Sequence, residues 1–287
     1  MLKRRTDLAV EAHELWQQSG AKTTALPGVL ARDETLEGVT LHRVEILDED
    51  GERALGKPRG TYLTLEVGAL RRHETEKFAC AARAIGAALA PLLPEEGSVL
   101  VAGIGNAAMT PDALGPRTLD HILVTRHLGT VLPDLRPVAA VGAGVLGTTG
   151  IEVAEWVRGC AQRVKPAAVI LVDALAARSV DRLCSTIQIA DSGLVPGSGV
   201  GNHRMALNRA ALGVPVVSVG VPTVVEAATL ARDLTGREDG WEGREPFFVT
   251  PDSIDAKIAD LARLVGYGID LALQPGLEWE DLAALLE

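Results

Sequence analysis

The sequence predicts an α/β fold, a three-layer α/β/α arrangement with a mostly parallel central sheet and an N-terminal β-rich elaboration. Between Val99 and Leu234, short apolar runs alternate with helical segments, which is the order of βαβ units with helices on both sheet faces. Hydrophobic residues make up 47% of the 287 residues and aromatic residues only 3%. The core must therefore consist mainly of Ala, Val, Leu and Ile, which suits buried strands covered by Ala- and Leu-rich helices.

The N-terminal elaboration rests on two segments with period-2 alternation, Val39–Ile46 and Gly60–Glu66. Turn signals separate them, so we expect a hairpin, either at the sheet edge or in a small subdomain. For residues 3–14 two interpretations stay open. Thr6 or Asp7 caps a short helix that follows it, or these residues form an extended leader.

The remaining elements follow from apolar runs and from helical spacing between glycine and proline signals. The expected strands are residues 99–102, 137–141, 167–172, 184–189 and 214–220. The expected helices are residues 73–93, 118–128, 152–164, 224–234 and a last one that starts near Thr250.

Composition excludes several classes of function. A net charge of −10 argues against binding to nucleic acid, which needs basic patches. The three cysteines, Cys80, Cys160 and Cys184, are far apart and have no metal-ligand spacing, which predicts reduced thiols in a cytoplasmic protein. Neither a signal peptide nor a membrane-spanning run is evident. We expect no cofactor and no membrane partner; a metal ion is left open.

A glycine turn and a carboxylate follow the first expected strand. The strand runs into Gly103-Ile104-Gly105-Asn106, where glycine permits a sharp turn or a close backbone approach. Asp112 comes next, between Pro111 and Pro116, which fix φ on either side of it. This layout is typical of a site at the carboxyl edge of an open α/β sheet, although an Asp in a turn has the same sequence signature.

Asp173 directly follows the strand-like run at 167–172. Because the carboxyl ends of parallel strands meet at one edge, we expect Asp112 and Asp173 to converge there. Two close carboxylates share a proton, which provides one base and one acid near neutral pH, as peptide hydrolysis requires. The alternative for Asp173 is a helix N-cap.

Three further side chains have both a functional and a structural interpretation. Ser198 lies in the glycine-rich loop 196–202, which could hold an anion but lacks the strand-turn-helix context of a serine nucleophile. His127 ends an expected helix, where a surface or core histidine is the alternative to a catalytic one. Arg178 follows Asp173 closely and forms either a surface ion pair or a substrate contact.

Eight segments taken together resemble the spore germination protease family, in family order and over nearly the whole chain. They are residues 5–12, 60–66, 110–116, 124–128, 173–179, 196–202, 220–225 and 249–251. The chain departs from the family pattern at Ala143, where proline is usual, and in the short stretch between Val225 and Val249.

The resemblance implies an endopeptidase that cleaves the small acid-soluble, DNA-protecting proteins of spores during germination, in the spore core. It implies an aspartic-type zymogen, with two essential aspartates that match Asp112 and Asp173. It also implies a homotetramer and processing between Asp7 and Leu8, so that residues 1–7 are a propeptide and residues 8–287 a single peptidase domain. Residues expected to shape the site or bind substrate are Gly103, Gly105, Asn106, Thr110, His127, Arg178, Ser198 and Gly199.

The fold also resembles the hydrogenase-maturation peptidases, whose glycine turn and acidic residue match Gly103–Asn106 and Asp112. Those relatives act around a metal ion. Metal-dependent processing is therefore the alternative activity, and a non-catalytic binding protein on the same scaffold is the second alternative.

Overall fold

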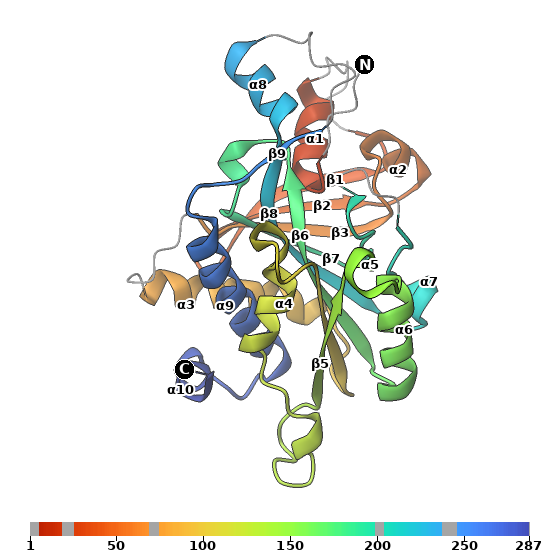
Figure 1. Cartoon of the computed structure of the whole chain (residues 1–287), viewed down its shortest axis with the longest axis vertical. Helices are drawn as coiled ribbons and strands as arrows, with labels where there is room; N and C mark the ends of the chain where they lie inside the picture. Colours follow the sequence, from red (N-terminus) through yellow and green to blue (C-terminus); the bar gives the residue numbers. More distant parts are fainter. Residues whose placement is uncertain (1–5, 19–25, 69–74, 199–203, 237–245, 287) are drawn as a thin grey trace.

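The computed structural model describes residues 6–18, 26–68, 75–198, 204–236 and 246–286. Within these ranges nine strands form one sheet in the order β1-β2-β3-β7-β8-β6-β4-β5, and β9 pairs with β8 (Figure 1). The strands are β1 (Val29–Leu36), β2 (Val39–Ile46), β3 (Gly60–Glu66), β4 (Val99–Ile104), β5 (Val138–Gly144), β6 (Ala168–Ala177), β7 (Thr186–Ala190), β8 (Val216–Glu226) and β9 (Phe248–Val249).

The predicted α/β class is confirmed, and the sheet is mixed. Strands β8, β6, β4 and β5 run parallel, as the alternation of strands and helices predicts. The N-terminal hairpin joins this sheet through antiparallel pairing of β3 with β7, which itself pairs antiparallel with β8. The β-rich elaboration is therefore a continuation of the central sheet.

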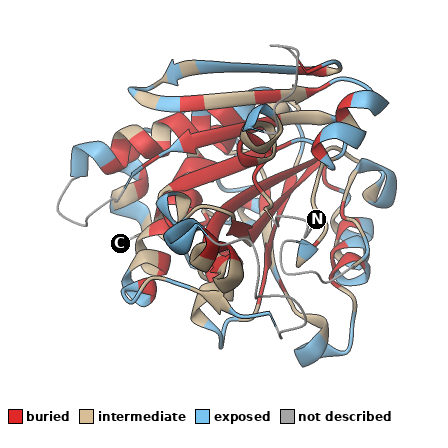
Figure 2. Ribbon diagram, turned by 90° about the horizontal axis from the view of Figure 1, so that it is seen from above, coloured by how far each residue is buried: buried red, intermediate tan, exposed pale blue. Residues whose placement is uncertain are grey.

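Helices cover both faces of the sheet. The helices of the described residues are α1 (Ala9–Gln18), α2 (Glu49–Leu55), α3 (Thr75–Leu89), α4 (Leu114–Thr118), α5 (Leu146–Thr149), α6 (Val153–Val164), α7 (Arg209–Leu212), α8 (Ala227–Thr235), α9 (Ile254–Leu273) and α10 (Trp279–Leu286). One core packs α3, α4 and α9 against the sheet, and on the opposite face α6 and α1 pack over two smaller cores. Figure 2 shows the buried residues concentrated in the middle of this three-layer arrangement.

Strand β6 explains why the most apolar run of the chain lies at the centre. Ile170 and Val172 point into the core under α3 and α9, whereas Val169 and Leu171 point into the core under α6. A strand buried on both faces needs apolar residues at every position. Asp173 continues the alternation on the α6 side and interrupts the apolar run.

Several expected elements differ in extent. Residues 118–128 do not form one helix: α4 ends at Thr118, and only short 3₁₀ turns follow. The Leu123 N–H instead donates to the buried Asp270 carboxylate and the Thr125 N–H to the carbonyl of Val138, which replaces helical hydrogen bonds. Strand β6 runs on past Asp173, and β8 runs on to Glu226, because the two pair with each other along this length.

Candidate active site

The segment that carries Asp112 is pressed against the end of β4. Gly105 has φ +124°, and a Cβ there would lie 2.0 Å from the Asp112 carbonyl oxygen, so the turn requires glycine. The Asn106 N–H donates to Asp112 Oδ2 at 2.8 Å. The hydroxyl of the buried Thr223, on β8, donates to the Pro111 carbonyl at 2.7 Å and fixes this segment from the neighbouring strand.

A second close approach brings this segment to β6. A Cβ on Gly115 would lie 2.2 Å from the Ile104 carbonyl oxygen and 2.5 Å from that of Val172. Backbone therefore packs directly on backbone at the residue before Asp173. The glycines of the sequence motif thus act through packing: they let the Asp112 segment lie beside the Asp173 strand.

The two aspartates are electrostatically coupled. Asp173 is 5% exposed and lies inside β6. Burial raises its pKa well above the ordinary value, and the nearby charges of Asp112 and Asp7 raise it further, against one hydrogen bond from the Ala174 N–H. Burial also raises the pKa of the half-buried Asp112, while the Asn106 N–H opposes that shift. Of the two carboxyl groups, Asp173 is therefore the one whose surroundings favour the protonated form more strongly.

A cavity of about 190 Å³ opens beside Asp173. Its lining includes Asp7, Lys57, Gln188 and Ser198, from four separate parts of the chain. Asp112 is not among the lining residues. The sheet register accounts for the meeting of Asp173 and Gln188: both pair with Gly220 on β8, one from each side, so their side chains project from the same face.

The N-terminal segment forms part of the wall of this cavity. The Asp7 N–H donates to the Ala176 carbonyl on β6, and the Ala176 N–H donates to the Asp7 carboxylate, each at 2.9 Å. The Ser198 hydroxyl donates to the same carboxylate at 2.9 Å. Leu8 is fully buried against Ala177. Asp7 and Leu8, predicted from the resemblance as the processing point, therefore lie at the candidate site.

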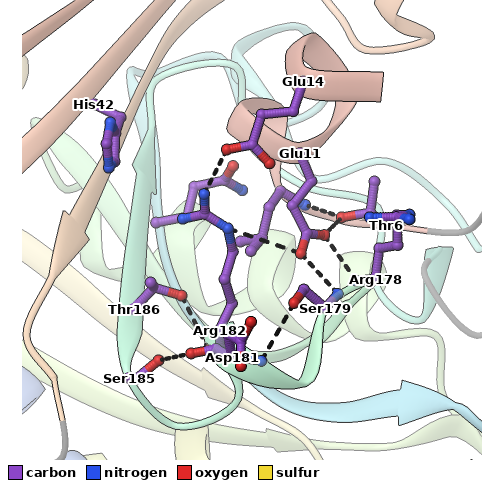
Figure 3. A network of polar contacts seen from close by, with 12 residues as sticks. Thr6, Glu11, Glu14, His42, Arg178, Ser179, Asp181, Arg182, Ser185 and Thr186 are labelled. Atoms are coloured by element: carbon purple, nitrogen blue, oxygen red, sulfur yellow. Dashed lines mark hydrogen bonds and ion pairs between the residues drawn. The ribbon is translucent and has the colours of Figure 1, made fainter. Parts of the chain in front are cut away.

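Helix α1 is tied to the end of β6 by a polar network (Figure 3). The Glu11 carboxylate, 2% exposed, accepts from the backbone N–H groups of Arg178 at 2.7 Å and Ser179 at 2.9 Å. It also accepts from the Thr6 hydroxyl. Arg182 reaches the same helix through an ion pair with Glu14 at 2.6 Å. This network fixes the chain that follows Leu8.

The structure brings together only part of the predicted site. Asn106 and Ser198 contact Asp112 and Asp7 respectively, and Thr110 donates to Asp255 of α9, which holds the loop from the other side. The Arg178 side chain pairs with Asp233 on α8 at 3.3 Å. Gly199 lies outside the described residues.

His127 does not lie with these residues. It is exposed, in a 3₁₀ turn next to Thr125, which is bonded to Val138 at the start of β5. Asp112 follows the end of β4, so His127 lies at the opposite edge of the parallel strands. The segment after α4 leads from the carboxyl end of β4 to the start of its parallel neighbour β5, which places His127 there.

Sequence reasoning missed Lys57 and Gln188. Lys57 follows the left-handed C-cap Gly56 of α2, in a stretch that has the composition of an ordinary turn. Gln188 is a polar residue in the otherwise apolar interior of β7, whose five residues are all buried. A buried amide on a strand needs hydrogen-bond partners, and that was the available signal.

Two further findings concern ligands and membranes. Among the described residues, no group of three or more His, Cys, Asp or Glu side chains is arranged to hold a metal ion. In the same part of the chain, no helix is long and apolar enough to cross a membrane.

Comparison with known proteins gives a consistent result over the whole chain. A family model described as germination protease matches residues 9–236. A germination protease of Caldanaerobacter subterraneus subsp. tengcongensis is 42% identical, with 98% of each chain covered. One of Clostridium tetani is 37% identical, with 98% of this chain and 99% of the relative covered.

Among solved structures, the [NiFe] hydrogenase maturation protease HycI of Thermococcus kodakarensis KOD1 aligns with a TM-score of 0.38 and 19% identity. The alignment covers 63% of this chain and 98% of that one. A similarity of this size carries no inference about function.

Proposed function

Because the chain belongs to the germination protease family, we propose that it initiates breakdown of small acid-soluble, DNA-protecting spore proteins and that Asp112 and Asp173 carry out the hydrolysis. Family membership makes the chain a protease of spore germination. The identity of the substrate and the roles of the two aspartates are the proposal. The observation that supports it most is the coupled pair of carboxyl groups, one just beyond the end of β4 and the other inside the neighbouring β6.

The two environments suggest different roles. Asp173 is more deeply buried, and two neighbouring carboxylates raise its pKa, so it keeps a proton and serves as the acid for the leaving amine. Asp112 is half-buried, accepts a backbone hydrogen bond and is the carboxylate that takes a proton from water.

This assignment predicts a bell-shaped pH profile. Activity rises with pH as the pair loses its first proton, at a pH above the ordinary Asp value because the pKa of Asp112 is raised. Activity falls again when the second proton leaves, because the acid for the leaving amine is then lost. The Asp173→Asn variant should lack the falling limb in any residual activity.

The test is cleavage of a purified small acid-soluble spore protein by Asp112→Asn and Asp173→Asn, followed by mass spectrometry of the products. Both variants should lose activity while unfolding at the wild-type temperature or above. Asp270→Asn is the matched control, because Asp270 is an equally buried aspartate that bonds Leu123 outside this site. If either variant of the site aspartates folds and still cleaves the spore protein at a near-wild-type rate, the proposal is refuted.

We further propose that residues 1–7 are a propeptide removed between Asp7 and Leu8, and that residues 8–287 form the peptidase domain. The position of Asp7 supports this, because it lines the cavity beside Asp173 and bonds to Ala176 on β6, where a substrate would have to bind. Deleting residues 1–7 should raise activity on added substrate, and unchanged activity would count against the propeptide. A tetramer in the spore core remains a proposal from the family; sedimentation tests the assembly.

Catalysis without a metal ion is also part of the proposal. Activity should survive dialysis against a chelator. Loss of activity on chelation, with recovery on adding back a divalent ion, would favour the metal-dependent alternative. Cleavage that is absent in the wild-type chain, with retained binding to the spore protein, would favour a binding protein.

A further inference from the structure

Two side chains that no family motif marks hold one carbonyl oxygen in the cavity. Lys57 Nζ donates to the Asp7 carbonyl oxygen at 2.9 Å, and Gln188 Nε2 donates to the same oxygen at 3.1 Å. Lys57 Nζ also reaches the Thr6 carbonyl at 3.3 Å. Two donors, one of them cationic, therefore converge on a single peptide oxygen.

Gln188 holds the backbone on both sides of Leu8. Its Oε1 accepts from the Ala9 N–H at 2.7 Å, while its Nε2 donates to the Asp7 carbonyl. The Leu8 N–H donates to the Thr6 hydroxyl at 3.0 Å. The peptide bond between Asp7 and Leu8 is thus held at its carbonyl, at its nitrogen and at the next residue, with the Leu8 side chain buried.

Carboxyl groups outnumber cations around this carbonyl. Asp7 and Asp173 line the cavity, and Asp112 acts on Asp173 electrostatically. Lys57 is the cation among the described lining residues. Burial lowers the pKa of Lys57, and the carboxylates of Asp7 and Glu11 oppose that shift. New negative charge on a carbonyl oxygen beside several carboxyl groups needs a nearby cation to offset the repulsion.

We propose that Lys57 and Gln188 bind the oxygen of the scissile carbonyl and stabilise the oxyanion that forms on it, first in removal of the propeptide and then with spore-protein substrates. The inference rests on the proposed function, because it takes Asp7–Leu8 as a bond that the chain cleaves. In the structure, the segment from Thr6 to Ala9 occupies the place of a substrate.

The step balances with water as the only co-reactant. The water oxygen bonds to the carbonyl carbon while one water proton passes to Asp112, and the carbonyl electron pair moves onto the oxygen held by Lys57 and Gln188. The electron pair on this oxygen then re-forms the carbonyl, and the C–N bond breaks as the proton of Asp173 passes to the leaving nitrogen. The products are a carboxylic acid and an amine, and the proton on Asp112 returns to Asp173.

The test uses the full chain and two readouts. One is the first-order loss of residues 1–7, followed by intact mass; the other is kcat and KM on a purified small acid-soluble spore protein. Lys57→Met keeps the length of the side chain and removes its charge. Gln188→Glu keeps the acceptor for the Ala9 N–H and replaces the donor with an oxygen. Lys257→Met is the matched control, because Lys257 is a half-buried lysine that lines a different small cavity.

Loss of one oxyanion donor lowers kcat by about 100- to 1,000-fold in well-studied hydrolases. We expect a loss of that order in both readouts for Lys57→Met and Gln188→Glu, with KM on the spore protein nearly unchanged. Lys57→Arg should recover part of the loss, and Lys257→Met should behave as wild type. If Lys57→Met is too unstable to assay, Gln188→Glu and Lys57→Arg test the inference in its place.

A purely structural role gives a different result. If Lys57 and Gln188 only anchor the N-terminal segment, their variants retain wild-type kcat on the spore protein once the segment is gone, and the inference is overturned. If the wild-type chain cleaves neither itself nor the spore protein, or if Asp112→Asn stays active, the proposed function fails and this inference falls with it.

Discussion

Replacing Glu11 by Ala should destabilise the protein far more than the same change at Glu14, one turn later on α1. The Glu11 carboxylate is 2% exposed and accepts two backbone hydrogen bonds, at 2.7 and 2.9 Å, from the chain that leaves β6. Ala removes both acceptors and leaves the N–H groups of Arg178 and Ser179 without their partner.

Hydrogen bonds to a charged acceptor contribute about 1.5–3 kcal/mol each, so the loss of two lowers the free energy of unfolding by about 3–6 kcal/mol. For a chain of this size, each kcal/mol moves the melting temperature by about 2 °C, so the expected shift is about 6–12 °C. The Glu14 carboxylate is 42% exposed in its ion pair with Arg182, and such a pair contributes about 0–1 kcal/mol.

Urea unfolding followed by tryptophan fluorescence measures both variants, and Trp16 on α1 reports on the docking of this helix. Glu11→Gln, which keeps one acceptor oxygen, should fall between wild type and Glu11→Ala. The reasoning is refuted if Glu11→Ala loses no more stability than Glu14→Ala, since the buried carboxylate would then contribute no more than an exposed one.

Three further predictions concern the interior and the catalytic loop. Burial raises the pKa of Asp270 to about 8, so its folded form retains a proton that the unfolded form loses. This group should therefore lower stability by about 1.4 kcal/mol per pH unit between roughly pH 4 and 8. Unfolding at pH 5 and pH 8 should show that Asp270→Asn is less sensitive to pH than the wild type by about that amount, and an unchanged slope would contradict the burial effect. Gly105→Ala places a Cβ 2.0 Å from the Asp112 carbonyl oxygen at φ +124°, so it should lower the free energy of unfolding by about 2 kcal/mol or more and lower kcat. Gly147→Ala, where a Cβ meets open space, should change neither quantity. Equal effects of the two substitutions would contradict the packing described. Thr223→Val removes the 2.7 Å hydrogen bond to Pro111 and should cost about 1–3 kcal/mol with a fall in kcat, and an unchanged kcat would show that this bond does not position Asp112.

The strands that the sequence predicts well are those buried on both faces. In β4, and in β6 as far as Val172, every position is buried and apolar, so these runs stand out from the chain without any knowledge of neighbours. The predicted helix at 118–128 fails because Asp270, more than 140 residues later, accepts the Leu123 N–H. Local propensity cannot anticipate a hydrogen bond between residues so far apart in the sequence. Helix α10 has no counterpart among the expected elements.

The same distinction holds for the site. Asp112 and Asp173 were identifiable because each follows an apolar run, and the topology of parallel strands brings such ends together. Lys57 and Gln188 were not, because their role depends on register: Gln188 reaches the cavity only because β7 pairs antiparallel with β8 at Gly220. His127 lies near the start of β5, at the edge of the parallel strands opposite to Asp112. The placement of Asp7 in the cavity wall depends on Ala176, 169 residues away.

The anchoring of α1 has a consequence for synthesis on the ribosome. Arg178 follows Glu11 by 167 residues, and at about 5–20 residues per second roughly 8–33 s separate the synthesis of these partners. Ser198, which contacts Asp7, comes later still. Until then the first residues of the nascent chain have nothing to dock on, and the cavity has no wall. The cavity beside Asp173 therefore forms only after most of the chain has been synthesised, because its lining comes from residues as far apart in the sequence as Asp7 and Ser198.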